Sequence, residues 1–162
     1  MKHLRETEAM EFVRQNTSIL APKVFLAFTY RGSSYIVMEK IQGISLHDVL
    51  VEGPSAKLKT TLLRQLKEMI NELRSIEPPH SFSIGDVNGT PDRHPRLSNP
   101  HYRGPYLTMK TFRLDFRNGI DASNTGYIPG LAEFVPVQDR ASSKLVFTHG
   151  DLSSDNIIGH GD

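Results

Sequence analysis

The most regular pattern of hydrophobic and polar positions lies between Pro54 and Ile76. Apolar side chains recur there at every third or fourth residue: Leu58, Leu62, Leu66, Met69, Leu73 and Ile76. This spacing places them in one stripe along an α-helix, with Ser55 as a candidate N-cap. Pro78-Pro79 ends the pattern, because a proline disfavours helical backbone in the residue before it. The stripe spans too few heptads for a coiled coil, so it predicts a helix that packs against a core.

Shorter patterns before this helix predict another helix and a pair of strands. Apolar residues at helical spacing predict a helix over residues 4–15, which Asn16-Thr17-Ser18 should end. Two runs rich in Val, Ile, Phe and Tyr, at residues 24–30 and 34–38, are separated by Arg31-Gly32-Ser33, which predicts an antiparallel hairpin. Ser45 then stands where it could cap a short helix that continues to Leu50.

The second half of the chain has weaker periodicity. Residues 80–105 are rich in Pro, Gly, Asn and Asp and show no sustained period, and such long irregular segments are often binding loops or lids. Helical spacing returns over residues 109–116, stops at Asn118-Gly119, and recurs weakly over residues 131–134. Leu145-Val146-Phe147 is predicted to be a short buried strand.

Composition sets limits on the class of protein. A chain of 162 residues, 38% of them hydrophobic, can form one ordinary domain with a core. No apolar run approaches the roughly 20 residues that cross a bilayer, and no apolar signal region follows Met1, so we expect a cytoplasmic protein without a membrane partner. The absence of cysteine excludes disulfides and thiolate chemistry.

Charge gives no general argument for an anionic partner. Nineteen basic and eighteen acidic side chains leave a formal charge of +1, so we expect no binding to nucleic acid. Basic residues are dense only between Arg93 and Arg117. That segment is interpreted either as a solvated surface or as a site for a phosphate-bearing or acidic ligand.

The densest group of potentially reactive side chains lies in V-F-T-H-G-D-L-S-S-D-N-I-I, residues 146–158. His149, Asp151 and Asn156 follow an apolar run and precede another, which predicts a strand, a polar loop and a second strand. Their spacing, His-x-Asp-x-x-x-x-Asn, matches the catalytic loop of a kinase position for position. In such a loop the aspartate accepts the proton of the attacking hydroxyl, and the asparagine oxygen binds Mg²⁺.

The same loop has other interpretations besides the kinase pattern. Asp151 and Asn156 could simply form turns, because both side chains bond their own backbone. A calcium loop would place Asp151, Ser153, Asp155 and Asp162 at its ligand positions, but it has Asn156 where the sharp turn needs glycine. Zinc binding by His149 and His160 has no recognised spacing, and a serine nucleophile lacks the G-x-S-x-G turn.

Most of the chain resembles the aminoglycoside phosphotransferase and choline kinase-like family. The loop H-G-D-L-S-S-D-N-I-I is similar to that family's catalytic loop, with Gly150 where protein kinases usually have arginine. R-E-T-E-A-M-E-F-V at residues 5–13 resembles its N-lobe helix, A-P-K-V at 21–24 its strand entry, and Y-I-V-M-E-K-I-Q-G at 35–43 the strand and hinge that receive adenine. S-I-G-D-V-N-G-T at 83–90 and G-P-Y at 104–106 resemble divergent members frequent in fungi.

This resemblance implies an α+β, protein-kinase-like fold in a single incomplete domain over residues 1–162. Residues 1–38 would form a partial N-lobe of a helix and antiparallel strands, 39–44 the hinge, and 45–162 a partial helical C-lobe ending at the catalytic loop. The implied activity is ATP-dependent transfer of the γ-phosphate to a hydroxyl of a small molecule. The implied partners are the nucleotide and that small molecule, and the cofactors are ATP and Mg²⁺.

The resemblance also assigns roles to individual residues. Asp151 would be the catalytic base, His149 would brace the loop by hydrogen bonding, and Asn156 would bind Mg²⁺. In the nucleotide site, Met38 would flank the adenine, while Glu39 and Ile41 would offer backbone groups to its edge. Glu6 would be the helix carboxylate that orients a phosphate-binding lysine, since this register leaves Ala9, Met10 and Val13 buried; Glu8 is the competing register.

Two parts of the family pattern are not found in these residues. The glycine-rich turn and the phosphate-binding lysine should precede the helix of Glu6, where only residues 1–5 stand. A second metal-binding carboxylate should follow Asn156 on the next strand, and Asp162 lies instead in a predicted turn. We therefore expect a domain truncated at both ends, with little or no transferase activity as an isolated chain. The alternative is a non-catalytic protein that keeps the fold as a binding module.

Overall fold

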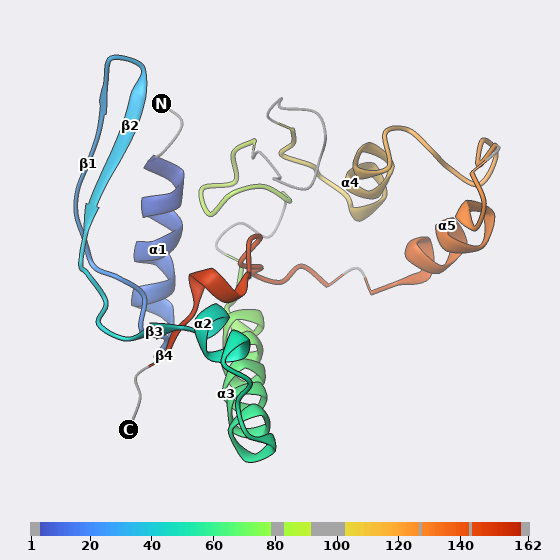
Figure 1. Ribbon diagram of the computed structural model, residues 1–162. Coiled ribbons are helices and arrows are strands. Elements are labelled where there is room, and N and C mark those ends of the chain that lie inside the picture. Colours follow the sequence, from blue (N-terminus) through green and yellow to red (C-terminus); the bar gives the residue numbers. More distant parts are fainter. Residues whose placement is uncertain (1–3, 79–82, 92–102, 127, 143, 160–162) are drawn as a thin grey trace. The chain divides into compact units, whose positions relative to one another are not determined.

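The protein has a mixed α+β structure with two compact units (Figure 1). The computed structural model describes residues 4–78, 83–91, 103–126, 128–142 and 144–159. The first unit comprises Met1–Glu77 and Val146–Asp162, and the second comprises Pro78–Leu145. The predicted lobe boundaries at residues 38 and 44 stay predictions. Among the described residues, no helix combines the length and the apolar character needed to span a membrane.

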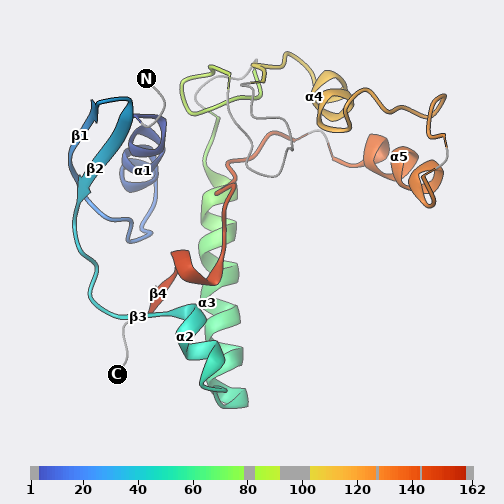
Figure 2. The ribbon, with the colours of Figure 1, turned by 45° about the horizontal axis from the view of Figure 1, so that its top comes forward.

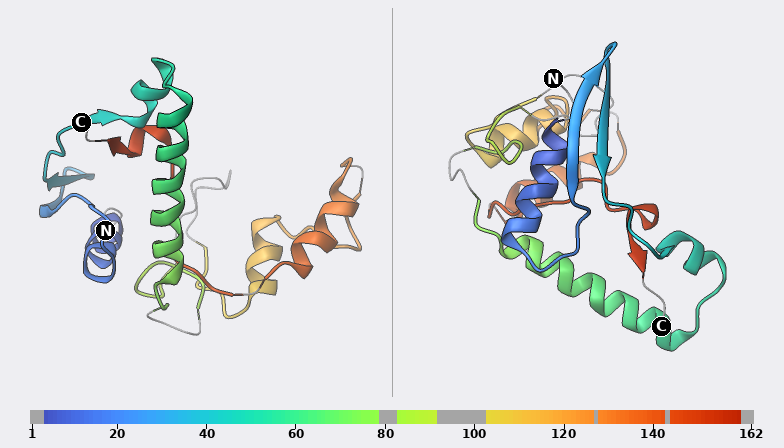
Figure 3. Two further views of the ribbon diagram at one scale, coloured as in Figure 1. Left: turned by 90° about the horizontal axis from the view of Figure 1, so that it is seen from below. Right: turned by 90° about the vertical axis from the view of Figure 1, so that its left-hand side faces the viewer.

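The first unit begins with helix α1 (Leu4–Asn16), which packs against a hairpin (Figure 3). The helix ends where the sequence predicted, because two side chains bond its last carbonyl groups. Asn16 Nδ2 donates to Phe12 O at 2.8 Å, and Thr17 Oγ1 donates to Val13 O at 2.8 Å. Val13 O also accepts from Thr17 N at 3.0 Å, so side-chain and main-chain donors together close the last turn of the helix.

Strands β1 (Val24–Tyr30) and β2 (Ser33–Met38) form the predicted antiparallel hairpin. Its two-residue turn has positive φ angles at both Arg31 (48°) and Gly32 (80°), which matches the right-handed twist of the strands. The paired residues Ala27 and Ile36 are half-buried. The opposite face carries apolar side chains that are 42 to 55% exposed: Leu26, Phe28, Tyr35 and Val37.

Two capped helices follow the hairpin, as predicted. Helix α2 (Leu46–Val51) begins after Ser45, whose Oγ accepts from Asp48 N at 3.1 Å. Helix α3 (Ala56–Ser75) begins after Ser55, whose Oγ accepts from Leu58 N at 3.2 Å. Of the predicted α3 stripe, Leu73 is buried, whereas Leu58 and Met69 remain 42% and 43% exposed.

A second, very short sheet joins segments that are far apart in the sequence. Strand β3 (Ile44–Ser45) pairs antiparallel with β4 (Ile158–Gly159), next to α2 (Figure 2). The strand predicted at residues 145–147 is wrong, because those residues join no strand ladder in the described chain. Phe147 is held instead by its ring, which stacks on that of Phe12 with centroids 5.8 Å apart.

The second unit contains α4 (Met109–Phe116) and α5 (Leu131–Arg140). Helix α4 has the predicted bounds and ends in two left-handed residues, Asn118 (φ 53°) and Gly119 (φ 81°). Helix α5 continues to Arg140, well beyond the predicted end at residue 134, although it contains Pro136. Ile84, in the segment predicted to be irregular, forms an isolated antiparallel bridge with Tyr106, the residue just after that segment.

A tyrosine, a carboxylate and a guanidinium hold this bridge against α4. Tyr106 Oη donates to Asp115 Oδ2, and Arg103 donates to Asp115 Oδ1 at 2.8 Å. Burial, followed by the hydrogen bond to Asp115, raises the pKa of Tyr106 to about 12. The phenol is therefore kept neutral at pH values at which a tyrosine in the unfolded chain ionises.

Alkaline pH should weaken the second unit through this tyrosine. A phenol whose folded-state pKa is raised stabilises the fold fully below its unfolded value of about 10. That contribution is lost as pH rises through the folded value of about 12. We expect the difference in free energy of unfolding between wild type and Tyr106→Phe, measured with urea, to shrink from pH 8 to pH 12. A difference independent of pH would contradict this.

Candidate active site

The loop that contains Asp151 and Asn156 is closed by its own hydrogen bonds. Asp151 O accepts from Ser153 N at 3.0 Å and from Asn156 Nδ2 at 2.9 Å. A single 3₁₀ turn, η1 (Ser154–Asn156), completes the loop, with Asn156 N bonded to Ser153 O at 3.2 Å. Asp151 and Asn156, which four residues separate in the sequence, are therefore in direct contact.

The Asp151 and Asn156 side chains lie next to each other at the surface. Asn156 Nδ2 is 3.4 Å from Asp151 Oδ2, and both residues are exposed. Because the amide nitrogen faces Asp151, the Asn156 Oδ1 lies on the other side of the amide. The pair thus offers one carboxylate and one amide oxygen to an approaching ligand.

These two oxygen ligands suit a Mg²⁺ ion that is bound together with a phosphate. They are too few for a metal site made of protein groups alone. Mg²⁺ prefers hard oxygen ligands and is usually bound through one or two protein groups together with substrate phosphates and water. The amide oxygen of Asn156 meets that requirement. The part of the chain that the structure describes has no group of three or more His, Cys, Asp or Glu residues that could hold a metal ion. A metal here would therefore depend on a phosphate-bearing ligand.

Gly150 has a conformational reason to be glycine. Its φ angle is +80°, in the left-handed region that L-residues with a side chain rarely adopt. A Cβ at this position would meet no atom within 4 Å, so the restriction comes from the backbone and not from a neighbour. The glycine allows the chain to turn sharply just before Asp151.

The other predicted site residues include His149, two residues before Asp151, and the acids of helix α1. His149 is exposed, and its imidazole makes no hydrogen bond to any residue that the structure describes. Glu6 is exposed in the first turn of α1, on a helix whose Ala9, Met10 and Val13 are half-buried, and its role stays a prediction. Glu8 is exposed as well.

The predicted adenine-binding residues lie at the end of β2 and in the loop after it. Met38 pairs with Val24 and is 45% exposed. Glu39 N donates to Lys23 O at 2.8 Å, and its carboxylate accepts from Lys23 N at 3.1 Å. Since the Glu39 N–H is already used, the carbonyl is the backbone group that it could offer to a base. Ile41 is half-buried.

The connection between this predicted hinge and the loop was not foreseen from the sequence. Strand β3 begins at Ile44, the last residue of the predicted hinge, and pairs Ile44 with Gly159 and Ser45 with Ile158. Leu46 N extends the contact by donating to Ile157 O at 2.8 Å. A strand of two residues is too short to show a periodic pattern. The apolar pair Ile157-Ile158 predicted a strand after the loop, but nothing in the sequence identified its partner.

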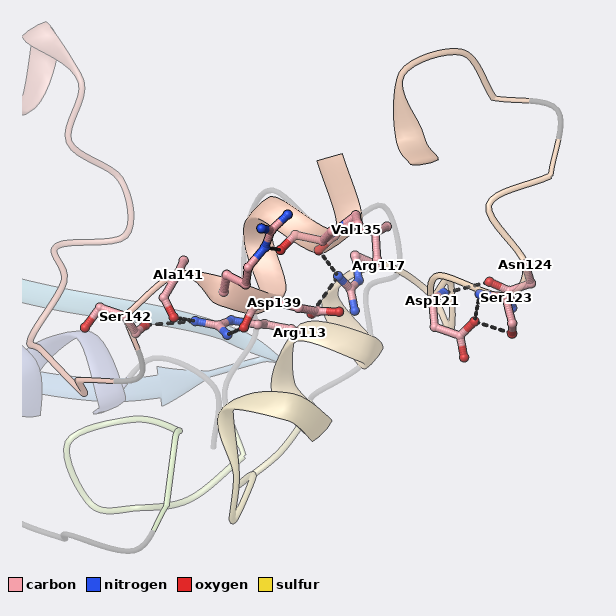
Figure 4. Close-up of polar contacts among 11 residues, drawn as sticks. Arg113, Arg117, Asp121, Ser123, Asn124, Val135, Asp139, Ala141 and Ser142 are labelled. Atoms are coloured by element: carbon pink, nitrogen blue, oxygen red, sulfur yellow. Dashed lines mark hydrogen bonds and ion pairs between the residues drawn. The ribbon is translucent and has the colours of Figure 1, made fainter. Parts of the chain in front are cut away.

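The basic segment before α5 uses its guanidinium groups internally (Figure 4). Arg113 donates to three main-chain carbonyls, and Arg117 bonds Asp139 Oδ1 at 2.9 Å. Arg103 bonds Asp115. These contacts favour a structural role for the three arginines over binding of an anionic ligand. Lys110, in α4, is exposed, and the other cluster members Arg93, His94, Arg96 and His101 lie outside the described residues.

Two of the predicted site residues, Asp151 and Asn156, are thus in direct contact, and a short ladder links their loop to the predicted hinge. Comparison of the chain with known proteins found no matching family model, no matching curated protein and no matching solved structure. A function for this chain therefore has to follow from its own residues.

Proposed function

We propose that this chain carries the catalytic loop of an ATP-dependent phosphotransferase with a protein-kinase-like fold, acting on a hydroxyl of a small molecule. The observation that carries the proposal is the hydrogen bond from Asn156 Nδ2 to Asp151 O, at 2.9 Å. It holds a carboxylate and an amide oxygen side by side at the spacing that phosphoryl transfer uses for its base and its metal ligand.

Each of the two residues would have a separate task in the reaction. Asp151 is exposed, so an acceptor hydroxyl can reach its carboxylate. As the hydroxyl oxygen forms its bond to the γ-phosphorus, the bond to the bridging oxygen of ADP breaks, and the hydroxyl proton passes to Asp151. Asn156 Oδ1 would hold Mg²⁺, which when bound offsets the negative charge of the phosphates.

The fold around the loop supports a nucleotide site nearby in the first unit. The β3–β4 ladder ties the loop to the segment of Glu39 and Ile41, whose backbone groups would bind the edge of adenine. Met38, at the end of β2, would contact the face of the base. A nucleotide bound to that segment would then lie in the same unit as Asp151 and Asn156.

A turn without any ligand could make the same hydrogen bond, because asparagine often closes turns. Ligand binding, and not the geometry of the loop, therefore decides between a phosphotransferase site and a simple turn. A phosphotransferase site should bind ATP in a way that depends on Mg²⁺. A turn should not bind it at all.

The test is ATP binding by the chain, measured by calorimetry with Mg²⁺ and again with EDTA. We expect binding that is lost on chelation, because Asn156 reaches the phosphates only through the metal. With γ-labelled ATP and a panel of small hydroxyl compounds, any transfer should disappear in Asp151→Ala and persist in Asp155→Ala. Asp155 is an equally exposed acid of the same loop, outside the kinase spacing. ATP binding that is absent or insensitive to chelation would refute the proposal, whereas Mg²⁺-dependent binding without transfer fits both a truncated enzyme and a binding module.

A further inference from the structure

Gly43, just before β3, lies unusually close to the strand that follows the loop. A Cβ built on this residue would lie 2.4 Å from Gly159 O and 2.6 Å from Ile158 Cγ2. Its φ angle is +145°, a conformation that residues with a side chain rarely adopt. The nearer contact is a backbone oxygen, which a rotamer change cannot move. Any side chain at residue 43 would therefore push β4 away from β3.

This contact lies at one end of the short ladder that leads back to the loop. The ladder pairs Ile44 with Gly159 and Ser45 with Ile158, and Leu46 N bonds Ile157 O at 2.8 Å. Ile157 is the residue directly after Asn156. Because only Ile157 and Ile158 separate Gly159 from Asn156, a shift of β4 should also move Asn156.

The displacement would change the pair that makes up the candidate site. Asn156 holds Asp151 through one hydrogen bond of 2.9 Å, and hydrogen bonds weaken steeply once their geometry is lost. A movement of about 1 Å at a site of this kind can reduce activity by about a hundredfold. The distance between β3 and β4 is thus coupled to the separation of Asp151 and Asn156.

We propose that Gly43 is a positioning residue for the site formed by Asp151 and Asn156. Its missing side chain allows β4 to approach β3 and so sets where Asn156 stands. The inference rests on the proposed function for the identity of the ligand. The positioning itself is a property of the strand contact and can be measured without any ligand.

Gly43→Ala should be compared with Gly53→Ala. Gly53 also has a left-handed φ angle, +75°, but a Cβ there meets nothing within 4 Å. Both substitutions should therefore strain the backbone, and only Gly43→Ala should displace β4. We expect Gly43→Ala to shift the NMR signals of the Asn156 side-chain amide and to weaken Mg²⁺-dependent ATP binding by roughly tenfold or more, as supporting residues around metal ligands do. Gly53→Ala should leave both readouts unchanged.

A second pair of variants covers the case in which Gly43→Ala fails to fold. Leu46 is the first residue of α2, where proline is tolerated, and Ser45 has φ −65° and ψ 146°, which suits a residue before proline. Leu46→Pro therefore removes the N–H that bonds Ile157 O while keeping the helix. Leu46→Ala controls for the lost side chain. Only Leu46→Pro should shift the Asn156 amide signals.

The outcomes separate this inference from the proposed function. Unshifted Asn156 signals in Gly43→Ala and in Leu46→Pro would overturn the positioning role, whatever ATP does. Equal shifts in Gly53→Ala or in Leu46→Ala would overturn it too. If wild type binds no ATP but the Asn156 signals shift as expected, the positioning role stands and the proposed function fails.

Discussion

Asn156→Ala should weaken Mg²⁺-dependent ATP binding by roughly tenfold or more, since a metal ligand is lost. The substitution removes the amide oxygen assigned to the metal and also the bond from Nδ2 to Asp151 O. Calorimetric titration of ATP with Mg²⁺ measures the first effect. The NMR signal of the Asp151 backbone reports the second.

The matched control is Asn124→Ala in the second unit. Asn124 Nδ2 donates to Gly119 O at 3.0 Å, which also closes a turn over five residues, and Asn124 is exposed like Asn156. The two substitutions therefore remove the same kind of bond, but only one removes a proposed metal ligand. Equal ATP binding by the two variants would contradict the assignment of Asn156.

Asn156→Asp separates the two tasks of the asparagine. It keeps an oxygen ligand but loses the donor that holds Asp151 O, and it places a second carboxylate where Nδ2 is now 3.4 Å from Asp151 Oδ2. Two carboxylates at such a distance repel each other unless a cation lies between them. We therefore expect this variant to retain Mg²⁺-dependent ATP binding. Its affinity for ATP should fall more than that of wild type when the metal is removed.

Local sequence signals predicted the elements that depend on a few neighbouring residues. Ser45 and Ser55 act as the expected N-caps, and the predicted hairpin turns at Arg31 and Gly32, with Ser33 already in the second strand. Each of these features rests on bonds within a few residues, which the sequence displays directly. The hydrogen bond between Asn156 and Asp151 is similarly local, since it spans five residues, but the roles of the two residues stay predictions.

Features that depend on distant partners were missed for a physical reason. The β3–β4 ladder joins residues more than a hundred positions apart, 44 and 159, and it is too short to produce alternation. Phe147 packs on Phe12 instead of joining a sheet, although its neighbours resemble a buried strand. Helix α5 extends beyond the weak hydrophobic pattern of residues 131–134, because the Arg113 side chain from α4 bonds the carbonyl groups at its end.

Arg113 is that side chain, and its replacement should have the largest effect on stability. It is only 8% exposed and donates to Asp139 O at 3.0 Å, Ala141 O at 3.0 Å and Ser142 O at 2.8 Å (Figure 4). Hydrogen bonds from a charged group contribute about 1.5–3 kcal/mol each and do not add fully when they share one donor group. We expect Arg113→Met to lower the free energy of unfolding by about 3 kcal/mol, measured with urea.

The comparison of substitutions identifies what Arg113 does. Arg113→Lys keeps the charge but cannot spread its donors over three carbonyls, so it should recover only part of the loss. Arg64→Met removes an exposed arginine that pairs with Glu68 on α3, and it should change stability by less than about 1 kcal/mol. An anion-binding role for Arg113 would make phosphate stabilise wild type and not Arg113→Met. Because its donors already bond the end of α5, we expect phosphate to have no such effect, and full recovery by lysine would contradict the capping role.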